Sequence, residues 1–311
     1  MVTSVIICTK NPRQSYLKRA IYSIQRQSLK KSYEFIVVDN GSANPVKRLF
    51  NKKHVNIKWV VQQSGGLTQA RISGFSASKG GLIVFVDDDN LLDKWYLENA
   101  LKLSKESKQI GVWSAEITGV FESKPPQWSE KYFPFLALIS HPQDKMSNRS
   151  NGGTLPIGAG MVVRRSVMAA YAKEMSKCSV HSRLDRRAGS LMAAGDTDIG
   201  YTALKLGYAC CYTKRLKVQH LIPKERLNPN YLHKLAKEVS ASHELLRCIH
   251  ENKKISFKER LKVAVAKIIS PFVSKKSKYG LKAAVIVGKW KGYRMYQQIL
   301  KSTACIDSAK S

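Results

Sequence analysis

Two hydrophobic periodicities alternate along residues 1–110. Short runs of consecutive apolar residues, many of them β-branched or aromatic, predict buried strands. These runs cover residues 2–8, 34–38, 56–61 and 82–87. Between them, apolar residues recur at helical spacing, as at Leu17, Ala20, Ile21 and Ile24. Because strands that alternate with helices are typical of a parallel sheet with right-handed connections, the pattern predicts an α/β domain.

The pattern is less regular in the following part of the chain. Residues 95–103 predict a helix and residues 111–117 a strand, whereas residues 121–153 are long and irregular, as in functional lids or binding walls. Residues 156–163 predict a glycine-bearing strand that leads into a helix at residues 166–173. Glycines in a strand indicate that a ligand approaches the backbone closely.

The buried strand at residues 82–87 ends in three adjacent carboxylates, Asp87, Asp88 and Asp89. In open α/β sheets, ligands bind outside the carboxyl ends of the strands. Adjacent acids repel one another unless a cation or hydrogen-bond donors surround them, and a divalent ion that bridges to a phosphate would provide the cation. The alternative is a solvated acidic turn in which Asn90 caps the next helix.

Other predicted strands also end in polar residues. The first is followed by the loop from Thr9 to Arg13, and the second ends in Asp39, Asn40, Gly41 and Ser42. Thr9 and Asp39 are candidates for hydrogen bonds to a nucleobase, and each is equally explained as a turn residue. Arg71, one turn into its helix, is either a phosphate ligand or a solvated helix charge. The Gly65-Gly66 pair is not part of a dinucleotide or P-loop motif, which argues against both of those enzyme classes.

Two further candidates lie later in the chain. Asp196 stands where a helix begins, so it is either an N-cap or a carboxylate held in the orientation that a general base needs. His220 follows a strand-like stretch, and imidazole is a ligand that suits Mn²⁺ better than Mg²⁺. The alternative for His220 is a structural histidine.

The formal charge of +31 indicates a polyanionic partner, because such a positive field attracts a polyanion. Much of the excess lies in residues 253–301, where 14 Lys and Arg accompany the single acid Glu259. Apolar residues and Trp290, Tyr293 and Tyr296 interleave with these bases at helical spacing, which favours helices in an anionic headgroup layer. The alternative is a solvated helix packed on the catalytic domain. Nucleic acid is not the expected partner, since there is no zinc-ligand spacing, RNA-binding signature or helix-turn-helix pattern.

The sequence also indicates a location. The six cysteines include no CxxC pair and are expected to be reduced. No secretory signal precedes the first strand, and no apolar run approaches the roughly 20 residues that span a bilayer. We therefore expect a cytoplasmic protein that is peripheral on the inner face of the cell membrane.

The order of these motifs resembles the family 2 glycosyltransferases of the GT-A fold. The resemblance spans about the first 220 residues and rests on six stretches of this chain. They are Ile7-Cys8-Thr9 with Asn11, residues 36–42, Gly66 through Ala70-Arg71, residues 85–89, Gly158-Ala159-Gly160 with Arg164-Arg165, and residues 195–198 through Leu206-Gly207-Tyr208. Each is weak alone, whereas together and in this order they are specific.

The resemblance implies an inverting transfer of a sugar from a nucleotide diphosphate, with a UDP-sugar as the expected donor. It places Thr9, Asp39 and Arg71 on the nucleotide, Asp87 on the ribose, Asp89 on a Mn²⁺ or Mg²⁺ ion, and Asp196 as the catalytic base. The expected nucleotide-sugar set also includes Asn11, Arg13, Asn40 and Asp88, and His220 is the second expected metal ligand. The family often has Glu-Asp where this chain has Gly195-Asp196, which leaves the base in place and puts a role for the missing Glu in doubt.

The expected fold is therefore α/β of the GT-A class: a Rossmann-like, mostly parallel central sheet flanked by helices, with a basic helical extension at the C-terminus. We expect a catalytic domain at residues 1–222, with a nucleotide-binding half at 1–110 and an acceptor half at 111–222, and the extension at 223–311. The expected acceptor is a saccharide, lipid-linked on a membrane, in bacterial surface polysaccharide synthesis. The alternatives are a nucleotidyltransferase on a similar sheet and a non-catalytic basic protein that binds membranes or nucleic acid.

Overall fold

The computed structural model describes residues 2–29, 33–50, 57–63, 66–177, 190–252 and 256–301. The chain divides into two compact units. Unit 1 comprises Met1–Val120, Ala137–Glu174 and Asp196–Ile222, and unit 2 comprises Phe121–Leu136, Met175–Gly195 and Pro223–Ser311. The predicted domain boundary at residue 222 is also a unit boundary, but two segments before it belong with the C-terminal helices. The functional division at residue 110 stays a prediction.

Unit 1 is built on one mixed sheet. Among the described residues its strands are β1 (Thr3–Thr9), β2 (Tyr33–Asp39), β3 (Ile57–Val61), β4 (Leu82–Asp87), β5 (Asn90–Leu92), β6 (Ile110–Val120 in this unit, of Ile110–Phe121), β7 (Lys145–Ser147), β8 (Val162–Arg164) and β9 (Ala209–Ile222). Their order is β3-β2-β1-β4-β8-β6-β9-β5, and β7 also pairs with β9. The half that contains β1 to β4 is parallel, whereas β8 pairs antiparallel with β4 and β6, and β9 pairs antiparallel with β5. The expected α/β fold with a flanked central sheet is confirmed.

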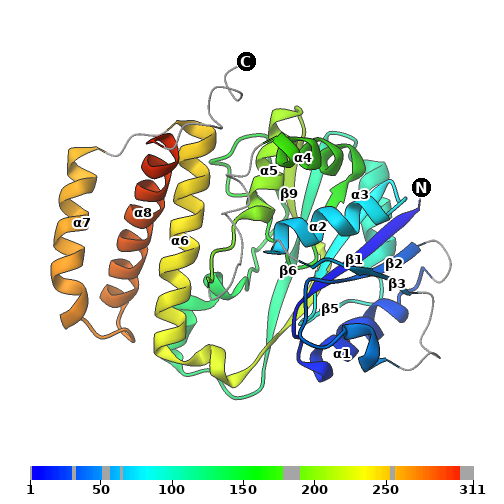
Figure 1. Cartoon of the computed structure of the whole chain (residues 1–311), viewed down its shortest axis with the longest axis horizontal. Helices are drawn as coiled ribbons and strands as arrows, with labels where there is room; N and C mark the ends of the chain where they lie inside the picture. Colours follow the sequence, from blue (N-terminus) through cyan, green and yellow to red (C-terminus); the bar gives the residue numbers. More distant parts are fainter. Residues whose placement is uncertain are drawn as a thin grey trace. The chain divides into compact units, whose positions relative to one another are not determined.

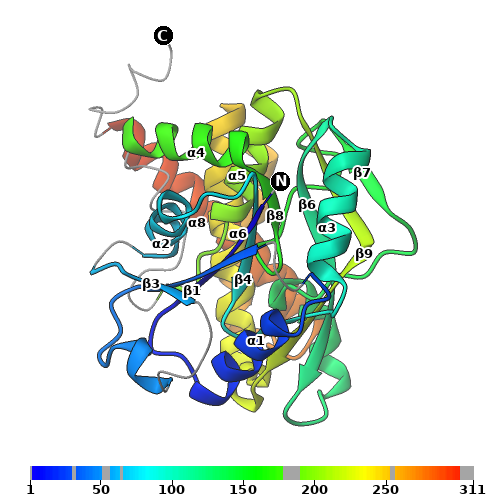
Figure 2. The same cartoon turned by 90° about the vertical axis from the view of Figure 1, so that its right-hand side faces the viewer.

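Helices cover both faces of this sheet. They are α1 (Gln14–Gln25), α2 (Gly66–Ala77), α3 (Tyr96–Glu106), α4 (Arg165–Lys177) and α5 (Gly195–Lys205), with a short 3-10 helix η1 (Val46–Leu49). The buried faces of α1 and α3 join one cluster with alternate residues of the parallel strands, such as Val5, Ile7 and Val84. Figure 2 shows these two helices on the same side of the sheet. On the other face α2 packs close, since a Cβ at Gly74 would lie 2.5 Å from Ile6.

The segment at residues 156–163 differs from its prediction. Only Val162 and Val163 of that segment belong to a strand, and Gly160 has a φ of +72°. A side chain there would meet Tyr96, because a Cβ at Gly160 would lie 2.8 Å from the Tyr96 hydroxyl oxygen. The glycines therefore serve a tight turn packed against the protein's own side chains. The irregular region at residues 121–153 also contains order, namely the 3-10 helix η2 (Gln127–Leu136) and β7.

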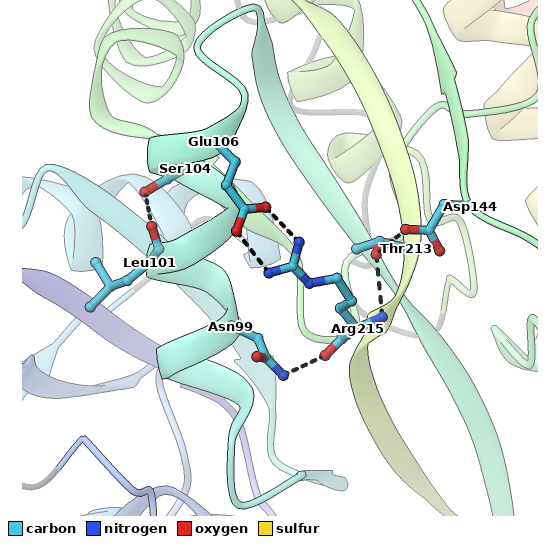
Figure 3. A network of polar contacts seen from close by, with 7 residues as sticks. All are labelled: Asn99, Leu101, Ser104, Glu106, Asp144, Thr213 and Arg215. Carbon is cyan, nitrogen blue, oxygen red and sulfur yellow. Dashed lines mark hydrogen bonds and ion pairs between the residues drawn. The ribbon is translucent and has the colours of Figure 1, made fainter.

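A polar network fixes β9 to its neighbours in unit 1 (Figure 3). Arg215 on β9 forms two hydrogen bonds to the carboxylate of Glu106 on α3, at 2.5 and 3.1 Å. The Asn99 amide donates to the Arg215 carbonyl at 2.9 Å, and the Thr213 hydroxyl donates to Asp144 at 2.6 Å. A single exposed ion pair contributes little, but a bidentate pair within a network sets geometry. This matters because β9 also carries His220.

Unit 2 contains three long helices joined by short segments. They are α6 (Pro229–Glu251), α7 (Phe257–Ile269) and α8 (Lys278–Lys301), with 3-10 helices η4 (Lys224–Leu227) and η5 (Ser270–Phe272). In Figure 1, α8 lies between α6 and α7. Asn228 caps α6, and a capping box of Ser256 and Glu259 begins α7. Lys253 and Lys254, which the sequence analysis counts in the basic segment, lie outside the described residues. No helix in the described part of the chain is long and apolar enough to span a membrane.

Three aromatic residues of α8, Trp290, Tyr293 and Tyr296, are not exposed as the headgroup-layer prediction requires. Tyr293 and Tyr296 are buried, and the Lys267 ammonium lies over the ring of Trp290, 5.6 Å from its centroid. The small residues of α8 allow this close packing, since α6 and α8 approach each other at Gly288 and Gly292. These aromatics therefore hold the three helices together.

We expect Gly292→Ala to lower the free energy of unfolding by about 1–3 kcal/mol, because it forces the packed helices apart. A Cβ at Gly292 would lie 2.1 Å from the carbonyl oxygen of Ala241 on α6, and a backbone atom cannot rotate away. Urea denaturation followed by circular dichroism measures the loss. Lys289→Ala, at an exposed position of the same helix, is the control and should be close to neutral. Equal stability of the Gly292→Ala variant would show that α6 and α8 do not pack at this distance.

Candidate active site

Strand register brings three predicted site residues to one edge of the sheet. Thr9 pairs with Asp39 where β1 and β2 end, and Cys8, just before Thr9, pairs with Asp87 on β4. The carboxyl ends of these three parallel strands are therefore level. Thr9 and Asp39 are buried in spite of their polarity, whereas Asp87 is half-buried. A ligand at this edge would meet all three strand ends at once.

The loops that follow β1 and β2 are tied together by Asn11. Its backbone N–H donates to the Ser42 hydroxyl at 2.8 Å, and its side-chain oxygen accepts from the N–H of Ala43 at 2.8 Å. Asn11 adopts a φ of +48°, which asparagine tolerates better than most residues. The predicted ligand-binding residue thus holds together the loops that follow the two strands.

Asp39 and Asn40, where β2 ends, differ in their hydrogen bonds. The Asp39 carboxylate accepts from the backbone N–H groups of Ser42 at 3.0 Å and of Val46 at 2.9 Å, which fixes its orientation. The side-chain oxygen of Asn40 is buried and has no hydrogen-bond partner among the described residues. A buried acceptor without a partner costs free energy, so this oxygen is the one at this strand end that a ligand donor would satisfy.

The three-carboxylate turn after β4 is held by donors within the protein. The Thr9 hydroxyl donates to Asp88, and the Asn90 amide donates to Asp89 at 3.1 Å. The side-chain oxygen of Asn90 accepts from the N–H of Asp87 at 3.3 Å. Asn90 is completely buried and begins β5, so it does not cap a helix. This positioning role of Asn90 was not predicted from the sequence, although an Asn directly after three Asp residues is a signal of a turn.

Asp89 and His220, the two predicted metal ligands, lie side by side. Asn90 on β5 pairs with His220 on β9, and this register places the His220 Nε2 atom 3.3 Å from a carboxylate oxygen of Asp89. Each residue is 7% exposed. The part of the chain that the structure describes contains no group of three or more such ligands that would enclose a metal. A carboxylate and an imidazole fit a divalent ion whose other ligands are diphosphate oxygens and water.

Arg71 is not a solvated helix charge. It is 4% exposed on α2, and its guanidinium lies over the Phe85 ring of β4, 5.8 Å from the ring centroid. It also lies against Gly158, where a Cβ would be 2.4 Å from Nη2. A buried guanidinium beside the strand ends is suited to bind an anionic ligand.

Asp196 lies within the first turn of α5, which begins at Gly195, and therefore beyond the N-cap position. One carboxylate oxygen accepts from the N–H of Gly158 and the other accepts from the N–H of Thr197 at 2.7 Å. A Cβ at Gly158 would lie 3.2 Å from Asp196 and close to Arg71, so Gly158 separates the two side chains. Gly158 is thus approached closely by Arg71 and Asp196, the predicted phosphate ligand and base, and the close approach of a ligand stays a prediction.

Gly158→Ala tests this arrangement. The added methyl group would displace the buried Arg71 guanidinium and disturb the Asp196 hydrogen bond, so we expect turnover to fall by about 10- to 100-fold. Gly153→Ala is the control, because a Cβ there has no atom within 4 Å although its φ of +70° adds strain. The control should lower the melting temperature without lowering kcat, and the Gly158→Ala variant should lower kcat. Equal kcat values for the two variants would show that Gly158 is not part of the site.

Arg13 is the predicted residue that the structure turns away from this group of side chains. It is exposed, and its guanidinium lies over the Tyr16 ring of α1, 5.4 Å from the centroid. The other predicted residues are carried by β1, β2, α2, β4, α5 and β9 and the loops that directly follow the strands. A ligand role for Arg13 stays a prediction.

The chain is similar in sequence to known proteins. Residues 4–171, more than half of the chain, match Glycosyl transferase family 2. A 92-residue stretch is 29% identical to glycosyltransferase GlyA of Streptococcus pneumoniae, and it covers 29% of this chain and 13% of that protein. A 126-residue stretch is 32% identical to the poly(ribitol-phosphate) β-N-acetylglucosaminyltransferase TarP of Staphylococcus aureus, covering 37% of this chain and 38% of TarP. The matched stretches thus span well under half the length of these relatives.

The structure is also similar to that of S. aureus TarS residues 1–349 in complex with UDP-GlcNAc. The TM-score is 0.53 at 15% identity, and the superposition covers 97% of this chain and 91% of that one. At 15% identity this likeness shows the fold. The sequence match shows the family. The chain belongs to glycosyl transferase family 2.

Proposed function

We propose that the chain is an inverting glycosyltransferase that moves a sugar from a nucleotide diphosphate to a hydroxyl group of a saccharide acceptor. The observation that carries the proposal is the position of Asp196, held by the N–H of Gly158 beside the buried Arg71, in the unit whose strand ends carry Thr9, Asp39 and Asp87. A base and a cation in the same unit as a row of polar strand ends are the parts that this reaction needs.

The roles proposed for the donor-binding residues follow the family resemblance, and the burial and contacts described above support them. Asn40 supplies an acceptor oxygen without a partner among the described residues, Thr9 and Asp39 line the nucleobase end, Asp87 receives the ribose, and Arg71 binds the phosphates. Asn11 and Asp88 support this edge through their hydrogen bonds to neighbouring loops. A UDP-sugar is the proposed donor, and the TarS complex with UDP-GlcNAc, a protein of similar fold, supports that choice.

The chemical step uses Asp196 as the base. Its carboxylate takes the proton from the acceptor hydroxyl while that oxygen forms a bond to the anomeric carbon of the sugar. The bond from the anomeric carbon to the diphosphate oxygen breaks, and the diphosphate leaves with the bonding electron pair. Because attack and departure occur on opposite faces, the anomeric configuration inverts. The two backbone hydrogen bonds hold the carboxylate in orientation before the acceptor arrives.

Asp89 and His220 are the residues that would hold a divalent metal. A Mn²⁺ or Mg²⁺ ion bound there would neutralise charge on the departing diphosphate. Asp89 and His220 would suffice to hold such an ion, because oxygen atoms of the donor diphosphate would supply other ligands.

The acceptor is proposed to be a lipid-linked saccharide of a bacterial surface polysaccharide, reached from the inner face of the membrane. Two observations support it: the name of TarP, a poly(ribitol-phosphate) β-N-acetylglucosaminyltransferase, and the basic helices of unit 2. The charge of those helices matches an anionic membrane surface.

A donor panel tests the proposal. UDP-, GDP-, CDP- and dTDP-sugars are added to the protein with Mn²⁺, Mg²⁺ or a chelator, and both the melting temperature and the released product are measured. We expect one donor to raise the melting temperature and to release nucleoside diphosphate slowly in the presence of metal. Release of pyrophosphate would instead indicate a nucleotidyltransferase, and no response to any donor would indicate a non-catalytic protein.

A further inference from the structure

Helix α7 has an apolar stripe that faces outward. Its members recur at helical spacing, and the structure leaves all of them exposed. They are Leu261, Val265, Ile268 and, in η5, Phe272. Phe272 is 87% exposed and Ile268 is 69% exposed, whereas large apolar side chains are normally buried. The stripe thus places exposed apolar side chains along α7 and into η5.

The other face of α7 already has its partner. Val263 and Ala266 are buried where α7 packs against α8, and Lys267 extends over Trp290 of α8. The outward stripe is therefore not needed for packing within unit 2. Figure 1 shows α7 at the edge of the three-helix layer, with α8 on its inner side.

Basic side chains border the stripe on both sides. Lys258 and Lys262 lie along one side by helical spacing, Arg260 lies along the other, and all three are exposed. The helix contains one acid, Glu259, and the capping box with Ser256 occupies its carboxylate. An apolar stripe with lysines at its borders is the pattern of helices that lie in a bilayer interface, where the side-chain ammonium groups reach the phosphates.

We propose that α7 and η5 form a membrane-insertion face, with Ile268 and Phe272 at its centre, that binds anionic phospholipid. This inference deepens the membrane part of the proposed function and rests on it. It differs from the expectation for residues 253–301 in assigning insertion to α7 and η5, because Trp290, Tyr293 and Tyr296 of α8 pack between helices.

A second copy of this chain is the less suitable occupant. The stripe spacing resembles a coiled-coil seam, but the positions beside it, such as Lys262 and Ala264, offer no acid to pair with a facing lysine. Two such helices would bring like charges together. An anionic lipid surface instead satisfies both the apolar stripe and its basic borders.

Vesicle co-sedimentation of the full chain tests the inference. The protein should bind vesicles of phosphatidylcholine with about 30% phosphatidylglycerol and should not bind vesicles of phosphatidylcholine alone. The double variant Ile268→Gln with Phe272→Gln should lower the partition coefficient by at least about 30-fold, since it removes two large apolar side chains from the interface. Met146→Gln, at an exposed apolar position of β7, is the matched control and should bind like the unchanged protein.

Phe272→Trp provides a second readout. The emission of the added indole should shift to the blue on vesicle binding and be quenched by brominated lipid, which a purely electrostatic contact would not cause. Unchanged vesicle binding by the double variant, or an added indole whose emission brominated lipid does not quench, would overturn the inference. So would a dimer or larger oligomer in light scattering that becomes monomeric in the double variant, because the stripe would then bind a second copy.

Donor hydrolysis measured without vesicles separates this inference from the proposed function. Both α7 side chains lie outside the residues assigned to the reaction, so the double variant should release nucleoside diphosphate at the unchanged rate. Normal hydrolysis with no vesicle binding by the unchanged protein would contradict the insertion face alone. Stripe-dependent vesicle binding with no turnover of any donor would contradict the transferase alone.

Discussion

Asp196→Asn is expected to lower the rate of sugar transfer by about 10²- to 10⁴-fold, the usual contribution of a positioned general base. The amide has nearly the shape of the carboxylate, and its oxygen can still accept one of the two hydrogen bonds from Gly158 and Thr197. It cannot, however, take a proton from the acceptor hydroxyl. The kcat of transfer should therefore fall, whereas the affinity for nucleotide measured by calorimetry should stay the same.

Asp93→Asn is the matched control for that experiment. Asp93 is exposed and accepts from the N–H of Trp95 at 3.0 Å, so the same chemical change occurs at a turn away from the proposed base. The control should keep full activity. If Asp196→Asn keeps its activity too, Asp196 is not the base.

Asp89→Asn is expected to abolish most of the metal-dependent turnover, by about 10²- to 10³-fold, which is the usual effect of removing one group that stabilises developing charge. The residue is buried, and an asparagine side-chain oxygen can still accept the hydrogen bond from Asn90. The fold should persist while the negative charge needed for the metal is lost. Calorimetric titration of Mn²⁺ into protein with bound UDP measures the effect without relying on activity.

His220→Gln refines the same test. The imidazole lies 3.3 Å from Asp89, so its loss should weaken Mn²⁺ affinity by about 10- to 100-fold. We expect Mg²⁺-supported turnover to suffer less, since Mg²⁺ prefers oxygen ligands. Unchanged Mn²⁺ affinity in Asp89→Asn would place the metal elsewhere, and unchanged affinity in His220→Gln alone would make His220 a structural residue.

The strand-end part of the site was predictable from sequence for a physical reason. Parallel strands present their carboxyl ends at one edge, so polar residues directly after apolar runs are brought together without knowledge of the loops. Thr9, Asp39 and Asp87 follow this rule. The grouping of Asp89 with His220 rests on the antiparallel pairing of β5 and β9, a register that no local pattern in the sequence specifies.

The arrangement around Gly158 was not predictable in the same way. Its closeness to Arg71 and Asp196 depends on how α2, α5 and a turn approach one another across long separations in sequence. A glycine indicates that something comes close but does not identify it. The turn itself was predicted as a strand, because Met161, Val162 and Val163 extend an apolar run whose first residues are bent by Gly160.

The C-terminal helices show the limit of composition as evidence. Periodicity identified apolar and basic faces, but it did not distinguish an apolar face that packs on a neighbouring helix from one that stays exposed. Gly288 and Gly292 bring α8 against α6, and Tyr293 and Tyr296 of α8 become interior residues. The outward stripe of α7 has the same hydrophobic pattern, and only its exposure in the structure separates the two.

The release of nucleoside diphosphate from a UDP-sugar tests the central proposal most directly. The unchanged protein and the Asp196→Asn variant are incubated with donor, acceptor polymer and Mn²⁺, with a chelator in parallel. We expect UDP release that requires metal, increases with acceptor and is lost in the variant. Release of pyrophosphate, or UDP release that is equal in both proteins, would contradict it.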